Sequence, residues 1–255
     1  MTLSFVSPDI SERAVAFDHK AIKIITLIGI PSAFLLHGYV GFIFGSVKAN
    51  PWWSSVLMPL VFLMSAIVSG IALVVFLYMV IAPLRGEGVD MRCLDRITSF
   101  LFYAVIVDFT LEGLDFIHRL YQSEESIKIL SRLVTDKLFI SLWVIQIFLG
   151  MLVPLGILIV VKSLKINEEL RRLFYFTAAI LIQLGIFATR WNVVIGGQLF
   201  SKSFRGLTTY KMEVVGIEGL IAAIVLLITP FIILAILLKL LPDGETENAG
   251  AAASS

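Results

Sequence analysis

Charged residues are scarce in this sequence. Lysine, arginine, aspartate and glutamate make up 15% of its 255 residues, whereas they are about a quarter of a typical soluble domain. Residues with hydrophobic side chains make up 58%, more than a soluble domain usually carries. This composition indicates an integral membrane protein, so the lipid bilayer is its first expected partner.

The residues in short supply exclude several classes of function. Positive charges exceed negative ones by one, so nothing is basic enough to neutralise a phosphate backbone, and we expect no nucleic-acid partner. The single cysteine, Cys93, excludes a disulfide framework and any all-cysteine zinc or iron–sulfur site within the chain. The sequence also lacks a Walker loop, a dinucleotide-binding glycine fingerprint, a nucleophile elbow and an HExxH motif.

Long apolar runs are abundant. A helix needs roughly 20 residues to cross about 30 Å of hydrocarbon. Six runs are about that long: 21–46, 56–84, 97–118, 138–161, 173–190 and 214–241. The predicted fold class is therefore an all-α integral membrane protein, a bundle of about six transmembrane helices within residues 21–241. We expect residues 1–20 to form an interfacial lead-in and residues 242–255 a disordered tail.

The number of spans sets the topology. An even number places both termini on the same side of the membrane, here called side A, and the opposite side is side B. The loops on side A carry slightly more lysine and arginine than those on side B. Because positively charged loops stay in the cytoplasm, both termini are predicted to be cytoplasmic.

The third run, Phe100 to His118, is the most charged of the six. Asp108, Glu112 and Asp115 are four and then three residues apart, so they share one helix face, which Arg119 continues. Carboxylates at that depth are costly unless they are paired, protonated or beside water. One interpretation is a proton relay made of the three acids. The alternative is an internal Asp115–Arg119 salt bridge with Asp108 protonated and inert.

A histidine lies in the side-B half of the first run. His37 precedes Tyr39, and the run leads to the polar turn Lys48-Ala49-Asn50-Pro51 and the pair Trp52-Trp53. An ionisable ring at that depth is a hypothesis for a functional site. The alternative is a structural histidine bonded to a neighbouring carbonyl. The two tryptophans are typical of an aromatic belt at the membrane interface.

The fifth run ends at side B in Thr189-Arg190-Trp191-Asn192. Arg190 is interpreted either as an interface anchor or as the partner of a carboxylate in the third run. The following turn, Gly196-Gly197-Gln198, would let the backbone approach closely. Gln146 and Glu218 lie near the side-B ends of their own runs. Together with His37, Asp115 and His118, which also lie toward side B, these positions predict one polar cluster there.

Few redox chemistries suit these residues. A bis-histidine haem needs two facing histidines, and His37 and His118 are the only candidates, with His118 at the end of a span. We therefore expect neither haem nor an iron–sulfur cluster in this chain. A quinol arriving through the bilayer fits better, because its hydroxyl can donate to an imidazole or a carboxylate between apolar walls. Its electrons would need a partner protein, docked on the side-B loops.

Three blocks of the sequence resemble a known family. The blocks are GIPSAFLLHGYVGFIFGSVKANPWWSSVLMPLVFLMSAIVSGIAL, VDFTLEGLDFIHRLYQSEES and TRWNVVIGGQLFSKSFRGLTTY. They are similar to membrane subunits of the polysulfide reductase (NrfD/PsrC-type) family, most of all to its hydrogenase-linked and sulfite-reductase-linked (HybB-like, DsrP-like) branches. The resemblance implies a haem-free, quinone-reactive, multi-pass subunit of a respiratory complex in a bacterial or archaeal cytoplasmic membrane. It also implies a ferredoxin-like iron–sulfur partner serving a molybdopterin, hydrogenase or multihaem cytochrome catalytic subunit.

The resemblance implies roles for particular residues as well. In related subunits a histidine in the block matching PSAFLLHGYV lies at the quinone pocket, which gives that role to His37. Deeper acidic groups are implied to form proton paths, here Asp108 and Glu112. The resemblance also implies an architecture: members of this family look to have about eight to ten transmembrane helices, and the helix that carries the histidine is not their first. This chain is therefore expected to match its C-terminal part, without about three preceding spans.

The sequence thus predicts three groups of site residues. The residues expected to carry chemistry are His37, Asp108, Glu112 and Asp115. The residues expected to bind a quinone, either menaquinone or ubiquinone, are His37, Tyr39, Arg190 and Asn192. The residues expected to dock the partner are Lys48, Asn50, Trp52, Trp53, Gln198 and Arg205. Two alternatives stay open: a proton-coupled secondary transporter that uses the third-run acids, and a passive membrane anchor of a redox complex.

Overall fold

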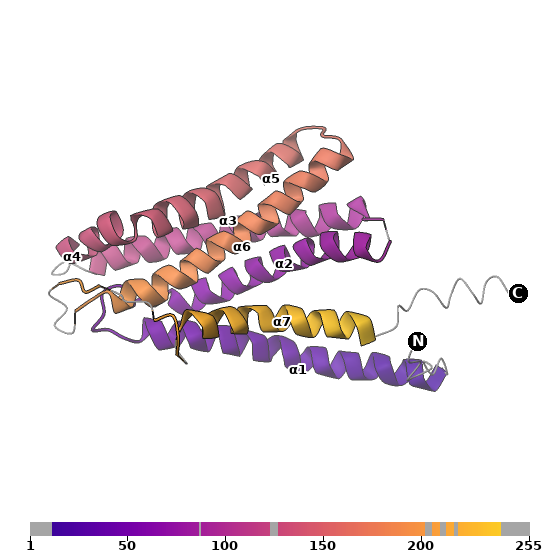
Figure 1. Cartoon of the computed structure of the whole chain (residues 1–255), viewed down its shortest axis with the longest axis horizontal. Coiled ribbons are helices and arrows are strands. Elements are labelled where there is room, and N and C mark those ends of the chain that lie inside the picture. The colour runs from indigo at the N-terminus through magenta and orange to yellow at the C-terminus, as the bar shows by residue number, and fades with distance from the viewer. Residues whose placement is uncertain are drawn as a thin grey trace, which may run out of the picture. The chain divides into compact units, whose positions relative to one another are not determined.

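The computed structural model describes residues 12–86, 88–122, 127–201, 206–209, 213–216 and 219–240. Their regular secondary structure is helical, apart from a single bridge between Phe200 and Leu207. Two of the helical segments, η1 and η2, are π-helices. Figure 1 shows the elements: α1 (Glu12–Gly45), α2 (Met58–Leu84), α3 (Met91–Gln122), α4 (Ile127–Arg132), η1 (Leu133–Lys137), η2 (Phe139–Leu152), α5 (Val153–Ser163), α6 (Glu168–Gln198) and α7 (Leu220–Leu240).

The membrane spans expected from the sequence correspond to these helices. Five segments of the described chain are long and apolar enough to cross a membrane: His19–Gly45, Met58–Leu84, Phe139–Ser163, Glu168–Gln198 and Leu220–Leu240. The remaining expected span, residues 97–118, lies within α3, which has 32 residues. Its acidic residues make α3 less apolar than the other five segments. The chain is therefore a multi-pass, all-helical membrane protein, as predicted.

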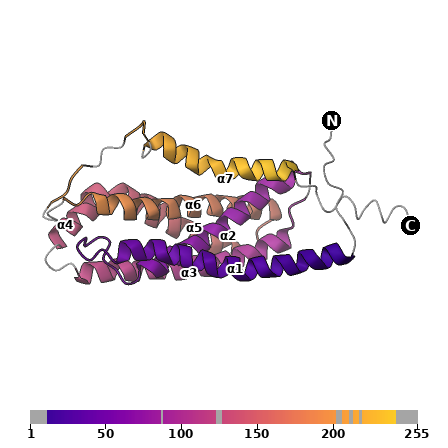
Figure 2. The same cartoon turned by 90° about the horizontal axis from the view of Figure 1, so that it is seen from below.

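The chain divides after Thr208 into two compact units. In the first unit, α2 packs against α1, α3 and α6, while α6 packs against α5 and η2 (Figures 1 and 2). The α1–α2 loop, α4 and the C-terminal ends of α3 and α6 gather at one end of this unit, on the left in Figure 1. This end corresponds to side B. The described part of the second unit contains α7, an apolar helix with Pro230 inside it.

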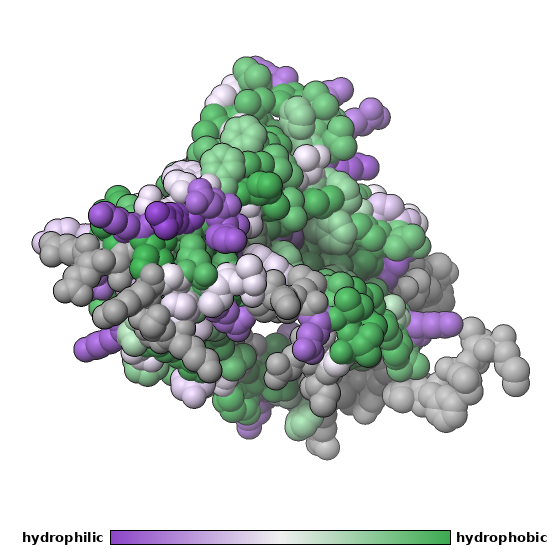
Figure 3. Space-filling view, turned by 60° about the vertical axis from the view of Figure 1, so that its left-hand side comes forward, coloured by the Kyte–Doolittle hydropathy of each residue, from purple (hydrophilic) through white to green (hydrophobic). Residues whose placement is uncertain are grey.

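The first unit has an apolar core and an apolar exterior. Its largest buried cluster joins α2, α3, α5 and α6 through residues such as Val75, Leu101, Leu158 and Ile182. Outward-facing side chains are also hydrophobic, and green dominates the face shown in Figure 3, with polar residues in separate patches. A soluble protein rarely exposes so much apolar surface, but a bilayer solvates it.

Two glycines let α6 and η2 approach closely. A Cβ atom added to Gly185 of α6 would lie 2.9 Å from the carbonyl oxygen of Gly150 of η2, so the two backbones touch at this crossing. Small residues at helix crossings in membranes permit such contact. The crossing brings the polar side chains of η2 beside those of α6.

The fourth expected span is wound in two ways. Residues Phe139–Leu152 form the π-helix η2, and the chain continues as the α-helix α5 with Pro154 in its first turn. Proline has no N–H to donate, which suits the first turn of a helix. π-Helical turns are rare and often occur at functional sites. Hydrophobicity predicted the span but not its winding.

Candidate functional site

A cavity of about 260 Å³ lies among α2, α3, η2 and α6, toward the side-B end of the first unit. Its walls are mainly apolar. Its lining residues are Trp52, Val61, Phe109, Glu112, Gly113, Asp115, Phe116, Arg119, Leu142, Trp143, Gln146, Ile147, Met151, Thr189, Asn192 and Val193. Gly113 and Trp143 are also exposed, so the cavity reaches the outer surface between α3 and η2. A few polar groups in an apolar concavity are typical of small-molecule sites.

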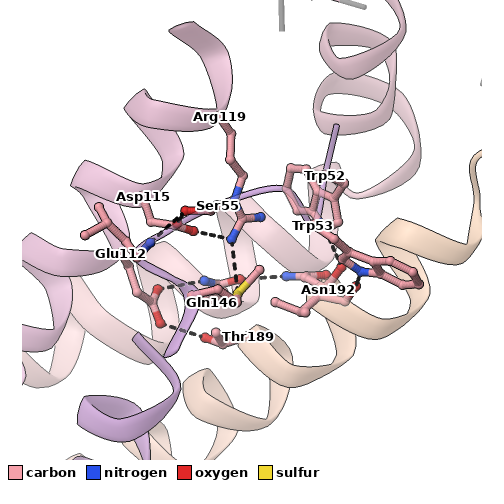
Figure 4. A network of polar contacts seen from close by, with 12 residues as sticks. Trp52, Trp53, Ser55, Glu112, Asp115, Arg119, Gln146, Thr189 and Asn192 are labelled. Carbon is pink, nitrogen blue, oxygen red and sulfur yellow. Dashed lines mark hydrogen bonds and ion pairs between the residues drawn. The ribbon is translucent and has the colours of Figure 1, made fainter. Parts of the chain in front are cut away.

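Glu112 is one of two carboxylates in the wall of this cavity, and it belongs to the polar network drawn in Figure 4. The Gln146 side-chain amide donates to Glu112 Oε2 at 2.8 Å, and the Thr189 hydroxyl donates to Oε1 at 3.2 Å. The Asn192 amide donates to Gln146 Oε1 at 2.7 Å. These bonds join α3, η2 and α6, and Asn192 Oδ1 is buried without a hydrogen-bond partner among the described residues. The wall of the cavity therefore holds a fixed carboxylate, and one residue of its bond network keeps an unused acceptor.

A second carboxylate, Asp115, is fully engaged in the structure (Figure 4). It forms a buried ion pair with Arg119, four residues later, and accepts a hydrogen bond from the Ser55 hydroxyl. The Arg119 guanidinium also lies over the Trp52 ring, 4.9 Å from its centroid. The salt-bridge alternative for Asp115 is therefore present, and it leaves Glu112 as the more accessible acid.

The α1–α2 loop is fastened to the end of α6. Trp52 Nε1 donates to the Asn192 carbonyl at 2.9 Å, Trp53 Nε1 donates to the Val193 carbonyl at 2.6 Å, and the Asn50 amide donates to the Gly197 carbonyl at 2.9 Å. A Cβ at Gly197 would overlap the Trp53 ring. The prediction of a turn at Gly196-Gly197-Gln198 is wrong, because these residues continue α6; close approach of other groups is the reason for the glycines.

The residues predicted to dock a partner divide into two groups by exposure. Asn50 and Trp52 are buried in contacts within the chain, and Trp53 is half-buried. Lys48 and Gln198 are exposed. Arg205 lies outside the described residues. The docking role stays a prediction. Among the described residues of this group, only Lys48 and Gln198 have exposed side chains that a partner could contact.

Asp108 lies on α3 one turn before Glu112 and is buried. Its Oδ1 has no hydrogen-bond partner within the described residues. Arg190 is not at the end of its span, as the sequence suggested, because α6 continues for eight more residues. Its guanidinium donates to the Phe62 carbonyl at 2.9 Å and to the Ser65 hydroxyl at 2.7 Å, and it interacts electrostatically with Asp108 and Glu112.

The predicted side-B cluster is assembled only in part. Two of its predicted members, Asp115 and Gln146, line the cavity, together with Glu112 and Asn192. His37, His118 and Arg190 are not among the lining residues. Glu218, which was also predicted to join the cluster, lies outside the described residues.

His37 and Tyr39 are not among the residues that line the cavity. His37 Nδ1 lies 2.9 Å from the carbonyl oxygen of Ala33 in its own helix, the bond that the structural alternative requires. Tyr39 is exposed. Their assignment to a quinone site stays a prediction.

Sequence reasoning missed several residues of the site. In the cavity wall, Thr189 was not predicted to bond an acid, and Phe116 and Trp143 were not singled out. Ser55, which bonds Asp115, was not singled out either. Thr189 and Asn192 are three residues apart and therefore share a helix face, which is a signal that the sequence does contain. The described residues include no group of three or more histidine, cysteine, aspartate or glutamate side chains able to hold a metal ion.

The part of the chain that matches known proteins includes all the helices that line the cavity. A family model described as "Polysulphide reductase, NrfD" matches residues 3–202. A selenate reductase subunit of Mesobacillus selenatarsenatis is 34% identical over 201 residues, which are 76% of this chain and 45% of that protein. The Hdr-like menaquinol oxidoreductase integral membrane subunit of Archaeoglobus fulgidus is 28% identical over 200 residues, 76% of this chain and 48% of that protein. The chain thus spans about half the length of these curated relatives. No solved structure matches.

Proposed function

The chain belongs to the polysulphide reductase NrfD family, and on this basis we propose that it is a quinol-reactive membrane subunit of a respiratory oxidoreductase complex. The observation that carries the proposal is the apolar cavity with Glu112, Gln146 and Asn192 in its wall. The similarity to subunits named for selenate reductase and menaquinol oxidoreductase supports a redox complex, with menaquinol as the preferred substrate.

The cavity suits the ring of a quinol rather than its tail. Its volume of about 260 Å³ is slightly below the range of about 300–1,000 Å³ for pockets that enclose drug-sized ligands. Phe116 and Trp143 supply flat aromatic walls, with ring centroids 6.2 Å apart. The tail of the quinol would leave past Gly113 and remain in the bilayer. An isoprenoid tail needs no enclosed tunnel when lipid surrounds the opening.

Glu112 is placed to take a proton from the bound ring. Oxidation of one quinol to quinone releases two electrons and two protons. In the proposal both electrons pass to an iron–sulfur partner subunit. Glu112 accepts the first proton and passes it on toward Asp108, which frees Glu112 to accept the second, while Gln146 and Thr189 hold its carboxylate in place. Asp108, one turn away, is the next acid on the same helix face, and Arg190 balances the charge of both.

The remaining predictions concern the complex. The iron–sulfur partner is proposed to be ferredoxin-like, to dock at side B near Lys48 and Gln198, and to serve a molybdopterin, hydrogenase or multihaem cytochrome subunit. The hydrogenase-linked and sulfite-reductase-linked branches are the proposed nearest kin. The complex is proposed to lie in a bacterial or archaeal cytoplasmic membrane. The lead-in at 1–20, the membrane domain at 21–241 and the tail at 242–255 also stay predictions.

Replacement of one acid tests the proposal. In the purified complex, Glu112→Gln should lower quinol-dependent reduction of the iron–sulfur partner at least tenfold, because positioned proton acceptors contribute roughly 10²- to 10⁴-fold. Glu169→Gln, at an exposed position of α6, is the matched control and should leave the rate unchanged. Normal turnover in Glu112→Gln would contradict the proposal.

A second variant separates the cavity from the predicted histidine. His37→Ala should keep the rate at limiting quinol if the cavity holds the ring, and should lose it if the ring binds beside α1. Normal turnover in an Asp108→Asn, Glu112→Gln double variant would favour the passive-anchor alternative, which the Asp115–Arg119 ion pair supports for one of the three acids.

A further inference from the structure

A groove runs along the outer surface between α2 and α3 and shares no residue with the cavity. It has a volume of about 570 Å³, and its lining residues are Ala66, Ile67, Gly70, Ile71, Val74, Arg96, Ile97 and Phe100. Seven of these eight residues have no charge. The groove is therefore apolar along its length, with one cation in its wall.

Small side chains keep the groove open. Ala66 and Gly70 are four residues apart on α2 and share one face, which Val74 continues. A Cβ atom added to Gly70 would meet nothing within 4 Å, so no neighbouring helix fills this space. The stretch from Ala66 to Val74 extends about 12 Å along the helix axis. This length suits part of an extended hydrocarbon chain.

The charge lies toward side A. Arg96 is in the second turn of α3, and Arg92 lies one turn earlier on the same face. Both side chains are exposed, and within the described part of the chain neither forms an ion pair. The nearby acid Asp95 is already engaged by Arg171 at 3.3 Å and by the Tyr175 hydroxyl at 2.8 Å. Two unpaired guanidinium groups thus adjoin an apolar groove near the end of a span.

We propose that this groove binds an anionic phospholipid. One acyl chain lies against Gly70 and Ile71, and the phosphate contacts Arg96 and Arg92 at the membrane surface. Guanidinium groups match phosphate geometry and form charge-assisted hydrogen bonds with it. Basic residues at the cytoplasmic ends of transmembrane helices commonly bind anionic headgroups. A zwitterionic headgroup brings its own cation and gains less from two arginines.

Native mass spectrometry of the full chain in detergent, with phosphatidylglycerol or phosphatidylcholine added, tests this proposal. The unaltered chain should retain phosphatidylglycerol at least fivefold better than phosphatidylcholine. An Arg92→Gln, Arg96→Gln double variant should lose this preference. Arg172→Gln is the matched control, because Arg172 is exposed near the same end of the bundle but lies on α6, away from the groove.

A third variant tests the apolar part. Gly70→Leu fills the groove and should lower retention of both lipids, while a monodisperse elution profile shows that the variant folds. Equal retention of the two lipids by the unaltered chain would overturn the proposal. So would an equal loss in Arg172→Gln. If Gly70→Leu instead leaves lipid retention intact and prevents a partner subunit from assembling, the groove holds a protein helix and the proposal is wrong.

Discussion

Two carboxylates on one face of α3 have different surroundings. Asp115 is paired with Arg119 and bonded to Ser55, so its charge is used inside the protein. Glu112 accepts from two neutral donors, Gln146 and Thr189, and faces a cavity. Neutral donors orient a carboxylate without neutralising it, which leaves its charge available to a ligand proton. The structural role therefore falls to Asp115 and the chemical role to Glu112.

The Asp115–Arg119 pair gives a stability prediction. Arg119→Met leaves a buried carboxylate without its cation, so the chain should lose about 3–5 kcal/mol of stability and yield little monodisperse protein. In an Asp115→Leu, Arg119→Met double variant no charge is left unpaired, and most of that stability should return. Thermal unfolding in detergent measures both. A double variant as unstable as Arg119→Met would show that the unpaired charge of Asp115 is not the cause of the lost stability.

The sequence predicted contacts between side chains of the same helix but not contacts between helices. The four-residue spacing of Asp115 and Arg119 fixes their contact wherever α3 forms, so the salt-bridge alternative was predictable. The contact of Glu112 with Gln146 and Thr189 was not. It depends on how far η2 and α6 slide past α3, and that register is set by the packing of apolar surfaces far from the acids. The burial of Trp52 was unpredictable for the same reason.

At the scale of elements, the crossing of η2 with α6 lets the polar side chains of the two helices meet in the cavity wall. Gly150 and Gly185 allow backbone contact at this point. Gln146 lies four residues before Gly150, and Thr189 lies four residues after Gly185. The polar bond network therefore begins about one turn beyond the contact. The π-winding of η2 had no signal in the sequence, since a run that is apolar on every side has no periodicity to measure.

Alanine substitutions at two glycines test this crossing. Gly185→Ala adds a methyl group where the Gly150 backbone lies, so it should separate the helices and lower the melting temperature by several degrees. Gly156→Ala makes the same change in α5, where a Cβ would meet nothing within 4 Å, and should be neutral or slightly stabilising because alanine favours helix. Differential scanning fluorimetry compares the two. Equal melting temperatures would mean that the crossing is not tightly packed.

The α1–α2 loop also differs from what the sequence predicted. Tryptophans after a span are typical of the membrane interface, and the sequence contains no sign that their N–H groups have carbonyl partners on α6. The structure uses both N–H groups there. The loop thereby contributes Trp52 to one end of the cavity.

At the scale of the whole molecule, the membrane fold was predictable from composition and run length. Five of six expected spans meet the length and apolarity expected of membrane helices, within a residue or two at many ends. Span five was predicted to end too early because Arg190 interrupts its hydrophobicity, whereas Phe62 and Ser65 satisfy that arginine inside the bundle. The remaining expected span lies in α3, which is less apolar. It can cross the membrane because neighbouring helices shield its acids from lipid.

The topology is testable with reporter fusions. If α3 crosses the membrane, green fluorescent protein fused after Leu84, Ser163 or Leu240 should fluoresce in the cytoplasm. Fusions after Gln122 or Gln198 should stay dark, because the protein fails to fold once exported. Expression blots control for the amount of each fusion. Fluorescence after both Leu84 and Gln122 would show that α3 does not cross.

The most direct test of the cavity is photoaffinity labelling of the complex with an azido-quinone, followed by peptide mass spectrometry. We expect adducts on Phe109–Phe116 of α3 and on Leu142–Met151 of η2, and we expect excess unlabelled quinone to remove them. Labelling of the α1 segment around His37, with none on α3 or η2, would contradict the assignment of the quinol ring to the cavity at Glu112.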